Sequence, residues 1–302
     1  MSKKPKVGMW SGLTAVTAVL TAGAIVGTTV AFHYTTTVNN YLDADTYKII
    51  RGDSDEDTEY FKSDFTSDEE RESYEAELCA QVEAEGAALL KNDNNALPLA
   101  SGAKVSLFGH GSVDLMYGGT GSGSVDTSKA PNFKQALEDQ GIQVNSTLWD
   151  LYSSDDMMKN YSRITPAAIS DTLEANTQYA VNEAPWSKLS SAESSFADYG
   201  DAAIVVFSRS GGEGADLPSG ENGTNDSWIK GQEGDGNYLA LSAEEKELLQ
   251  NLKTLKDNGT FKKIIVLINS SNAIEMDFLN PEICGEDYGI DSAMWIGDVG
   301  QT

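Results

Sequence analysis

The chain has 302 residues and carries 21 basic against 47 acidic side chains, a formal net charge of −26. Such a charge repels the phosphates of nucleic acid, so it excludes nucleic-acid binding and suits a neutral substrate. With only two histidines and two cysteines, the chain has too few of these residues for a histidine-based catalytic triad or a zinc site of the usual spacing. Carboxylates are the abundant groups for acid–base chemistry.

The segment from Met9 to Phe32 carries no charge and is long enough to cross a bilayer as a helix. Three lysines precede it, and the first carboxylate after it is Asp43. The positive-inside rule therefore predicts residues 1–8 in the cytoplasm, a single transmembrane anchor over 9–32, and the rest of the chain on the extracellular side of the cell membrane. A cleaved signal peptide is the alternative, because Thr21–Ala24 offers small residues to a peptidase, although the apolar stretch is longer than in most such peptides.

Residues 33–65 are polar and strongly acidic, and we interpret them as a spacer between the membrane and a folded domain. A helix is then predicted from a capping box, in which Ser67 is followed three residues later by Glu70. Apolar residues recur at helical spacing from Tyr74 to Leu90, so the helix is expected to run through that stretch.

From Lys104 onward the sequence alternates between strands and helices. Strands are predicted over 104–109, 202–208, 262–270 and 292–297, and helices over 132–141 and 241–259. The last helix has the clearest ends, with Ser242 as N-cap, Glu245 completing a capping box and Gly259 as the stop. Continuous apolar strands separated by helices predict an α/β fold over 66–302, a mainly parallel sheet covered by helices on both faces.

Two glycine-rich segments follow strands of this sheet, at the edge where ligands of α/β folds bind. GGTGSGS, after the first strand, lacks the lysine of a phosphate-binding loop and the GxGxxG spacing, so nucleotide binding is not predicted. Its glycines let the backbone approach a sugar closely, and a surface loop without function is an equal alternative. SRSGGEGADLP places Glu213 at the end of a buried strand, where partial burial would raise its pKa toward that of a general acid. A solvated loop carboxylate is the alternative.

Six blocks of the sequence resemble one family, in that family's order. They are EGAALLKNDNNALPLASGAKVSLFG, GGTGSG, AAIVVFSRSGGEGADLP, GDGNYLALSAEEKELL, IIVLINSSNAIEM and IDSAMWIGDVGQT. Over residues 83–302 they resemble the C-terminal α/β-sandwich domain of glycoside hydrolase family 3, the β-glucosidase family. The resemblance implies a hydrolase of O-glycosidic bonds.

In that family a barrel domain carries an aspartate nucleophile and the sandwich carries the acid/base glutamate, and neither a metal nor an organic cofactor is needed. The resemblance implies the acid/base role for Glu213 and a loop-organising or sugar-contacting role for Asp216. It also implies that the GTGSG segment lies beside the active site and binds substrate. That segment consists of Gly119, Thr120, Gly121, Ser122 and Gly123.

The domain order departs from the usual family pattern, in which the barrel precedes the sandwich. Here a membrane segment and a spacer come first, and the sequence stops inside a family motif. The resemblance therefore implies the swapped order, with the barrel downstream in cis, and we expect an incomplete part of a retaining β-glycosidase that acts on an oligosaccharide or glycoside. The alternative is a non-catalytic surface module that binds glycans or a partner protein, with Trp186, Trp228 and Trp295 as stacking residues.

Overall fold

The computed structural model describes residues 7–42, 63–128, 130–165, 179–213, 217 and 237–300. The chain divides into two compact units, residues 1–64 and 65–302. The first unit contains α1 (Val7–His33) and α2 (Thr35–Tyr41). Within α1, the 24 residues Trp10–His33 include an 18-residue stretch that has a mean hydropathy of 1.8 and is not buried, so by length and composition this helix is able to cross a membrane. A signal sequence near the N-terminus has the same properties.

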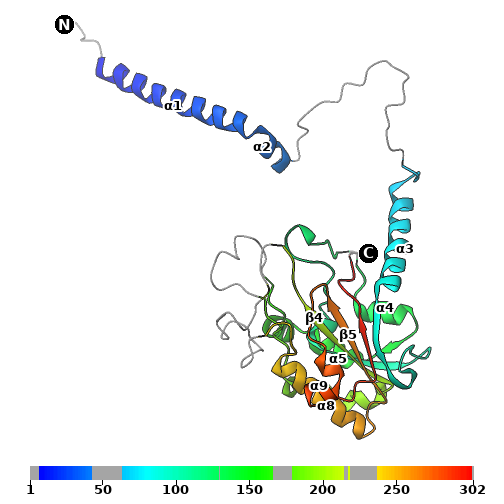
Figure 1. Ribbon diagram of the computed structural model, residues 1–302. Helices are drawn as coiled ribbons and strands as arrows, with labels where there is room; N and C mark the ends of the chain where they lie inside the picture. Colours follow the sequence, from blue (N-terminus) through cyan, green and yellow to red (C-terminus); the bar gives the residue numbers. More distant parts are fainter. Residues whose placement is uncertain are drawn as a thin grey trace, which may run out of the picture. The chain divides into compact units, whose positions relative to one another are not determined.

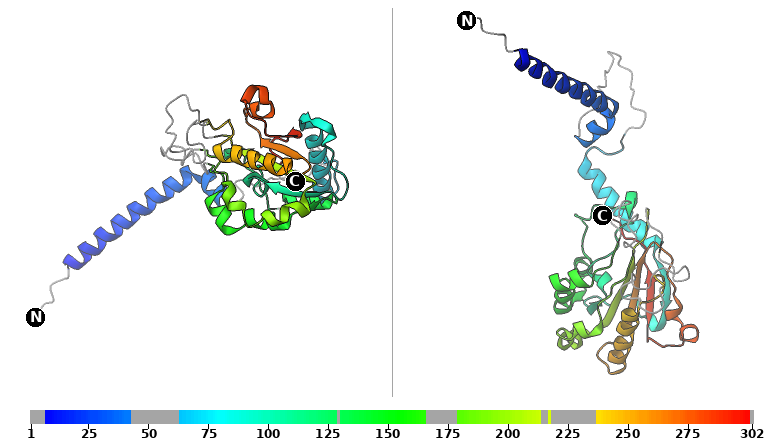
Figure 2. Two further views of the ribbon diagram at one scale, coloured as in Figure 1. Left: turned by 90° about the horizontal axis from the view of Figure 1, so that it is seen from below. Right: turned by 90° about the vertical axis from the view of Figure 1, so that its left-hand side faces the viewer.

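The second unit is built on a six-stranded sheet in the order β1-β6-β5-β4-β2-β3. Figure 1 shows its neighbouring strands β4 and β5 side by side. β1 pairs antiparallel with β6, and all other pairings are parallel. The right-hand view of Figure 2 shows the red, orange and yellow-green strands β6, β5 and β4 next to one another. The predicted mainly parallel sheet is confirmed. Its strands are β1 (Ala88–Asn92), β2 (Lys104–Phe108), β3 (Gln143–Val144), β4 (Ala202–Arg209), β5 (Ile264–Ser270) and β6 (Ser292–Trp295).

Helices cover both faces of this sheet. On one face, Phe207 belongs to a large apolar core together with Leu148 of α5 and Leu249 of α8. On the other face, Val105 belongs to a smaller core against which Leu137 of α4 packs. This arrangement confirms the predicted α/β architecture. Among the described residues, the α-helices of the second unit are α3 (Asp68–Gly86), α4 (Phe133–Asp139), α5 (Ser146–Tyr152), α6 (Asp155–Asn160), α8 (Ala243–Asp257) and α9 (Pro281–Cys284).

The two predicted capping boxes have different outcomes. At the start of α8, the Ser242 side chain accepts from the Glu245 N–H and the Glu245 carboxylate accepts from the Ser242 N–H, so this box is complete. At the start of α3, Ser67 accepts from the Glu70 N–H, but the Glu70 carboxylate accepts from the N–H and hydroxyl of Thr66. Only half of the second box is formed.

The prediction that α3 continues to Leu90 is wrong. The helix ends at Gly86, and Ala87 adopts an extended conformation with φ −61° and ψ 134°. Residues 88–92 then form the edge strand β1, in which Leu89 lies opposite Met294 of β6. A short apolar run fits a helix or a strand equally well, and here pairing with β6 decides between them.

Candidate functional site

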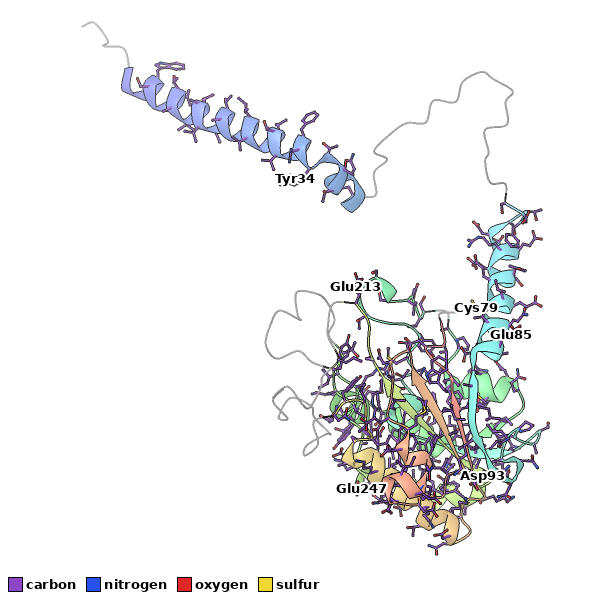
Figure 3. The ribbon with its side chains drawn as sticks, viewed as in Figure 1. Tyr34, Cys79, Glu85, Asp93, Glu213 and Glu247 are labelled. Atoms are coloured by element: carbon purple, nitrogen blue, oxygen red, sulfur yellow. The ribbon has the colours of Figure 1, made fainter. Side chains whose placement is uncertain are left out.

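The segments that follow β2 and β4 meet at the carboxyl edge of the sheet. The GTGSG segment, residues 119–123, follows β2, and Ser210–Glu213 follows β4 directly. Figure 3 shows Glu213 at the end of the domain opposite Asp93 and Glu247. This is the edge at which parallel α/β sheets bind their ligands, so the structure brings the two predicted glycine-rich segments together where a site is expected.

Backbone contacts join the two segments around Thr120. Thr120 and Gly212 form a parallel β-bridge, and the Thr120 N–H donates to the carbonyl oxygen of Gly211 at 3.3 Å. The Thr120 hydroxyl donates to the carbonyl oxygen of Glu213 at 3.0 Å. The backbone of Gly212 has φ +150°, and a Cβ atom there would lie 2.7 Å from the Thr120 hydroxyl oxygen. Glycine is therefore required at 212 for this close approach.

The Glu213 carboxylate contacts Ser122 of the GTGSG segment. Its Oε2 atom accepts a hydrogen bond from the Ser122 hydroxyl and another from the Ser122 N–H at 3.0 Å. These two hydrogen bonds, the hydroxyl first, lower the pKa of Glu213 because they stabilise the charged form. The expected rise in the pKa of Glu213 is wrong, because the side chain is exposed and its small desolvation raises the pKa less than the two hydrogen bonds from Ser122 lower it.

The other predicted site residues have different environments. Gly121 has φ +66°, and a Cβ atom there would lie 2.8 Å from Cβ of Glu213. A Cβ atom on Gly119 is less restricted, because its nearest neighbour would be 3.2 Å away, and a Cβ atom on Gly123 would have no neighbour within 4 Å among the described residues. Asp216 lies outside the described residues. The structure thus places Gly119, Thr120, Gly121 and Ser122 against the Glu213 segment and leaves Gly123 free of it.

Two of the three tryptophans proposed for sugar stacking pack against the main core. Trp186 lies with its ring centroid 6.3 Å from that of Phe108 in a stacked arrangement. Trp295 is also packed against the core, and its indole N–H donates to the carbonyl oxygen of Ser270 at 2.7 Å. Trp228 lies outside the described residues. These core contacts weaken the interpretation of Trp186 and Trp295 as a sugar platform.

An ion pair that was not predicted from the sequence lies next to the site, at the end of β4. Arg209, the last residue of β4, is fully buried, and its guanidinium binds both carboxylate oxygens of Glu245 at 2.8 and 2.7 Å. Burial lowers the pKa of Arg209, but the charge and hydrogen bonds of Glu245, together with Tyr238 and Glu183, more than offset this, so the pKa is raised. An arginine at the end of a continuous apolar strand was the available signal, because a buried charge needs a partner.

A second buried polar cluster follows β2. Glu183 is buried, and its carboxylate accepts from the N–H groups of His110 at 2.7 Å and Ala184 at 2.9 Å. Burial nevertheless raises the pKa of Glu183 to about 8. The His110 imidazole contacts Asp114, which also pairs with Arg163. Among the described residues, no group of three or more histidines, cysteines, aspartates or glutamates has the arrangement needed to hold a metal ion.

Comparison with known proteins identifies the family. The family model described as "Glycosyl hydrolase family 3 C-terminal domain" matches residues 87–300. Beta-glucosidase A of Butyrivibrio fibrisolvens is 31% identical over 216 residues, which cover 66% of this chain and 23% of that protein. The beta-glucosidase of Ruminococcus albus is 29% identical over 229 residues, which cover 75% of this chain and 20% of that protein. The chain therefore spans less than a quarter of the length of these relatives.

Solved structures agree with this result. A beta-glucosidase from Paenibacillus barengoltzii matches with a TM-score of 0.53 and 25% identity, over 75% of this chain and 22% of that one. Beta-glucosidase 3B from Thermotoga neapolitana, solved in complex with glucose, matches with a TM-score of 0.53 and 23% identity, over 77% of this chain and 28% of that one; at this identity the match shows the fold alone. The chain belongs to glycosyl hydrolase family 3, and residues 87–300 are a C-terminal domain of that family.

Proposed function

We propose that this chain supplies the acid/base half of a retaining β-glycosidase that hydrolyses O-glycosidic bonds in a β-glucoside or an oligosaccharide. One observation carries the proposal: the GTGSG segment holds the glutamate of the GEGAD motif, through the Thr120 bond to its carbonyl and the Ser122 bonds to its carboxylate. The names of the two curated relatives, both beta-glucosidases, support the substrate class.

In the proposed mechanism, an aspartate on a barrel domain attacks the anomeric carbon while Glu213 protonates the leaving oxygen. Glu213 then deprotonates the water that hydrolyses the glycosyl-enzyme, with the two carboxyl groups about 5–5.5 Å apart, as retention requires. The barrel is proposed downstream in cis, because the matched region makes up only 23% and 20% of the curated relatives. The mechanism needs neither a metal nor an organic cofactor.

The protonation state of Glu213 has to change during this cycle. In the uncovered site its pKa is lowered by Ser122, so the group is ionised at neutral pH. A barrel and a substrate that cover Glu213 would remove water, and the nucleophile would add a nearby negative charge; both effects raise the pKa of a carboxyl group. Formation of the glycosyl-enzyme neutralises the nucleophile, so the pKa of Glu213 falls again and the residue is ready to act as a base.

The remaining assignments belong to the same proposal. Asp216 organises the loop or contacts the sugar, and the GTGSG segment approaches the substrate through its backbone. α1 is an uncleaved anchor over residues 9–32 in the cell membrane, with residues 1–8 in the cytoplasm. Residues 33–65 are a spacer, and 66–302 form the sandwich on the extracellular side. The apolar length of α1 supports the anchor.

The test uses the enzyme encoded by the complete reading frame, followed beyond the codon for Thr302. We expect Glu213→Ala to slow cleavage of a disaccharide far more than the first step with a dinitrophenyl glycoside, because dinitrophenolate departs without a proton. Added azide, which needs no deprotonation, should restore turnover and yield a β-glycosyl azide.

The control is Glu85→Ala, which removes an exposed carboxylate of α3 that accepts a hydrogen bond from Gln81 at 2.8 Å. This variant should behave as wild type with both substrates. Equal slowing of both substrates by Glu213→Ala, without rescue by azide, would show that Glu213 is structural. A reading frame without a barrel, whose product binds glycans but hydrolyses none, would support the non-catalytic module instead.

A further inference from the structure

The guanidinium of Arg209 is held in one orientation by a full set of partners. Nε donates to the carbonyl of Tyr238 at 2.8 Å, and Nη1 and Nη2 donate to the carbonyls of Ser208 and Ala240 at 3.0 and 2.8 Å. The remaining two N–H groups bind Glu245. All five guanidinium donors are therefore used, so the Tyr238 backbone is fixed relative to the end of β4.

Tyr238, whose backbone is fixed by Arg209, binds the segment that carries Glu213 through its side chain. Its side chain is 1% exposed and its ring centroid lies 5.7 Å from Cζ of Arg209. Burial raises the pKa of Tyr238 to about 12, so its hydroxyl stays protonated and donates to the carbonyl oxygen of Ser210 at 3.0 Å. Ser210 precedes Glu213 by three residues, so this hydrogen bond fixes the backbone close to Glu213.

Tyr179 packs against Tyr238 and binds the GTGSG segment. It is 0% exposed, and its ring lies 5.9 Å from that of Tyr238 in one small apolar cluster. Its hydroxyl is 3.1 Å from the Thr120 hydroxyl oxygen. Thr120 uses its one hydroxyl proton on the carbonyl of Glu213, which only accepts, so Tyr179 is the donor to Thr120. The result is a directed chain of hydrogen bonds from Tyr179 through Thr120 to Glu213.

We infer that Tyr179 and Tyr238 are positioning residues for Glu213, which they hold from two sides, through Thr120 and through Ser210. The Glu213 side chain is exposed, so its orientation depends on the backbone on either side and on the contact with Ser122. A catalytic carboxyl has to be held within about 0.5 Å of its productive place. That this positioning serves catalysis rests on the proposed function of Glu213. That the two tyrosines position Glu213 through hydrogen bonds does not depend on that function.

The first test measures the link without turnover. Tyr179→Phe and Tyr238→Phe each remove one hydroxyl and keep the ring. Both variants are prepared as the full chain and measured in detergent. The Glu213 carboxyl is titrated by NMR with ¹³C-labelled glutamate, assigned with Glu213→Gln. Among the described residues only Ser122 lowers the pKa of Glu213, and no charged side chain contributes. Loss of positioning should therefore weaken the Ser122 contact and raise the pKa toward that of an ordinary glutamate.

Two controls separate this effect from general destabilisation. Tyr288→Phe alters another buried tyrosine, which belongs to the main core, and should leave the pKa of Glu213 unchanged. Thr120→Ser keeps the hydroxyl of the chain and should also leave it unchanged, whereas Thr120→Val removes that hydroxyl and should reproduce Tyr179→Phe. An unchanged Glu213 pKa in Tyr179→Phe, Tyr238→Phe and Thr120→Val would overturn the inference.

The second test uses turnover by the complete enzyme. Tyr179→Phe should lower kcat for a disaccharide by about tenfold, a change of about 1.4 kcal/mol, with little change in KM. Cleavage of a dinitrophenyl glycoside should be less affected, because it does not need the acid. An equal effect on both substrates would contradict a role through Glu213. If the pKa of Glu213 rises in Tyr179→Phe and Tyr238→Phe but the wild-type enzyme hydrolyses no glycoside, the positioning is supported and the proposed function is refuted. Failure of the inference and failure of the proposed function are therefore distinguishable.

Discussion

Replacing Gly212 by alanine would place a Cβ atom 2.7 Å from the hydroxyl oxygen of Thr120 and still closer to its backbone nitrogen. The overlap with a backbone atom is not relieved by rotating a side chain. Gly212 also has φ +150°, a region in which a residue with a side chain is strained by about 1–3 kcal/mol. The two segments therefore have to separate, and the hydrogen bonds from Thr120 to Gly211 and Glu213 are lost.

We expect Gly212→Ala to lower the free energy of unfolding by about 1–3 kcal/mol. In a domain of this size each kcal/mol lowers Tm by about 2–4 °C. The measurement is thermal unfolding of the full chain in detergent, followed by circular dichroism. Because Ser122 would no longer reach the Glu213 carboxylate, the pKa of Glu213 should also rise toward that of an ordinary glutamate.

Two other glycines of the GTGSG segment calibrate this result. Within the part of the chain that the structure describes, a Cβ atom on Gly123 would have no neighbour within 4 Å, so Gly123→Ala should unfold at the wild-type temperature. Gly119→Ala should have an intermediate effect, because its nearest neighbour, the carbonyl oxygen of Gly211, would be 3.2 Å away. If Gly212→Ala unfolds like Gly123→Ala and leaves the pKa of Glu213 unchanged, the contact between the two segments does not form in solution.

Two further predictions concern single side chains, and a third concerns the membrane orientation of the chain. Ser122→Ala should raise the pKa of Glu213, because the larger of its two causes of lowering is removed, and an unaltered NMR titration would contradict the contact. Glu183 keeps its proton in the folded state up to about pH 8, whereas the unfolded chain releases it near pH 4.5, so its contribution to stability falls by about 1.4 kcal/mol per pH unit as pH rises between these values. The free energy of unfolding, measured by urea unfolding at several pH values, should fall less steeply with pH in Glu183→Gln than in wild type. If the two depend on pH equally, Glu183 is ionised in the folded state. Protease added to intact cells should degrade the chain beyond Tyr34 and spare a tag placed before residue 9, and digestion of that tag would reverse the proposed orientation.

The parts of the fold that were predicted correctly have local causes. The start of α8 is set by Ser242 and Glu245, whose reciprocal hydrogen bonds span three residues, so the pattern is visible in the sequence. The central strands β4 and β5 are continuous apolar runs because helices cover both of their faces. The edge strand β1 was missed, since its assignment depends on pairing with β6, about two hundred positions away.

For the candidate site, the sequence by itself determined which residue to examine: Glu213 follows a buried strand, in a motif that resembles that of a known family. Only the tertiary structure decided its state. Its carboxylate accepts from Ser122, 91 positions away, so its pKa is lowered although partial burial was expected to raise it. Likewise, Arg209 is visible as a buried charge, but its partner Glu245 is 36 positions away. Ionisation and orientation depend on hydrogen bonds between distant segments, and such bonds form only when the strands of the sheet bring their ends together.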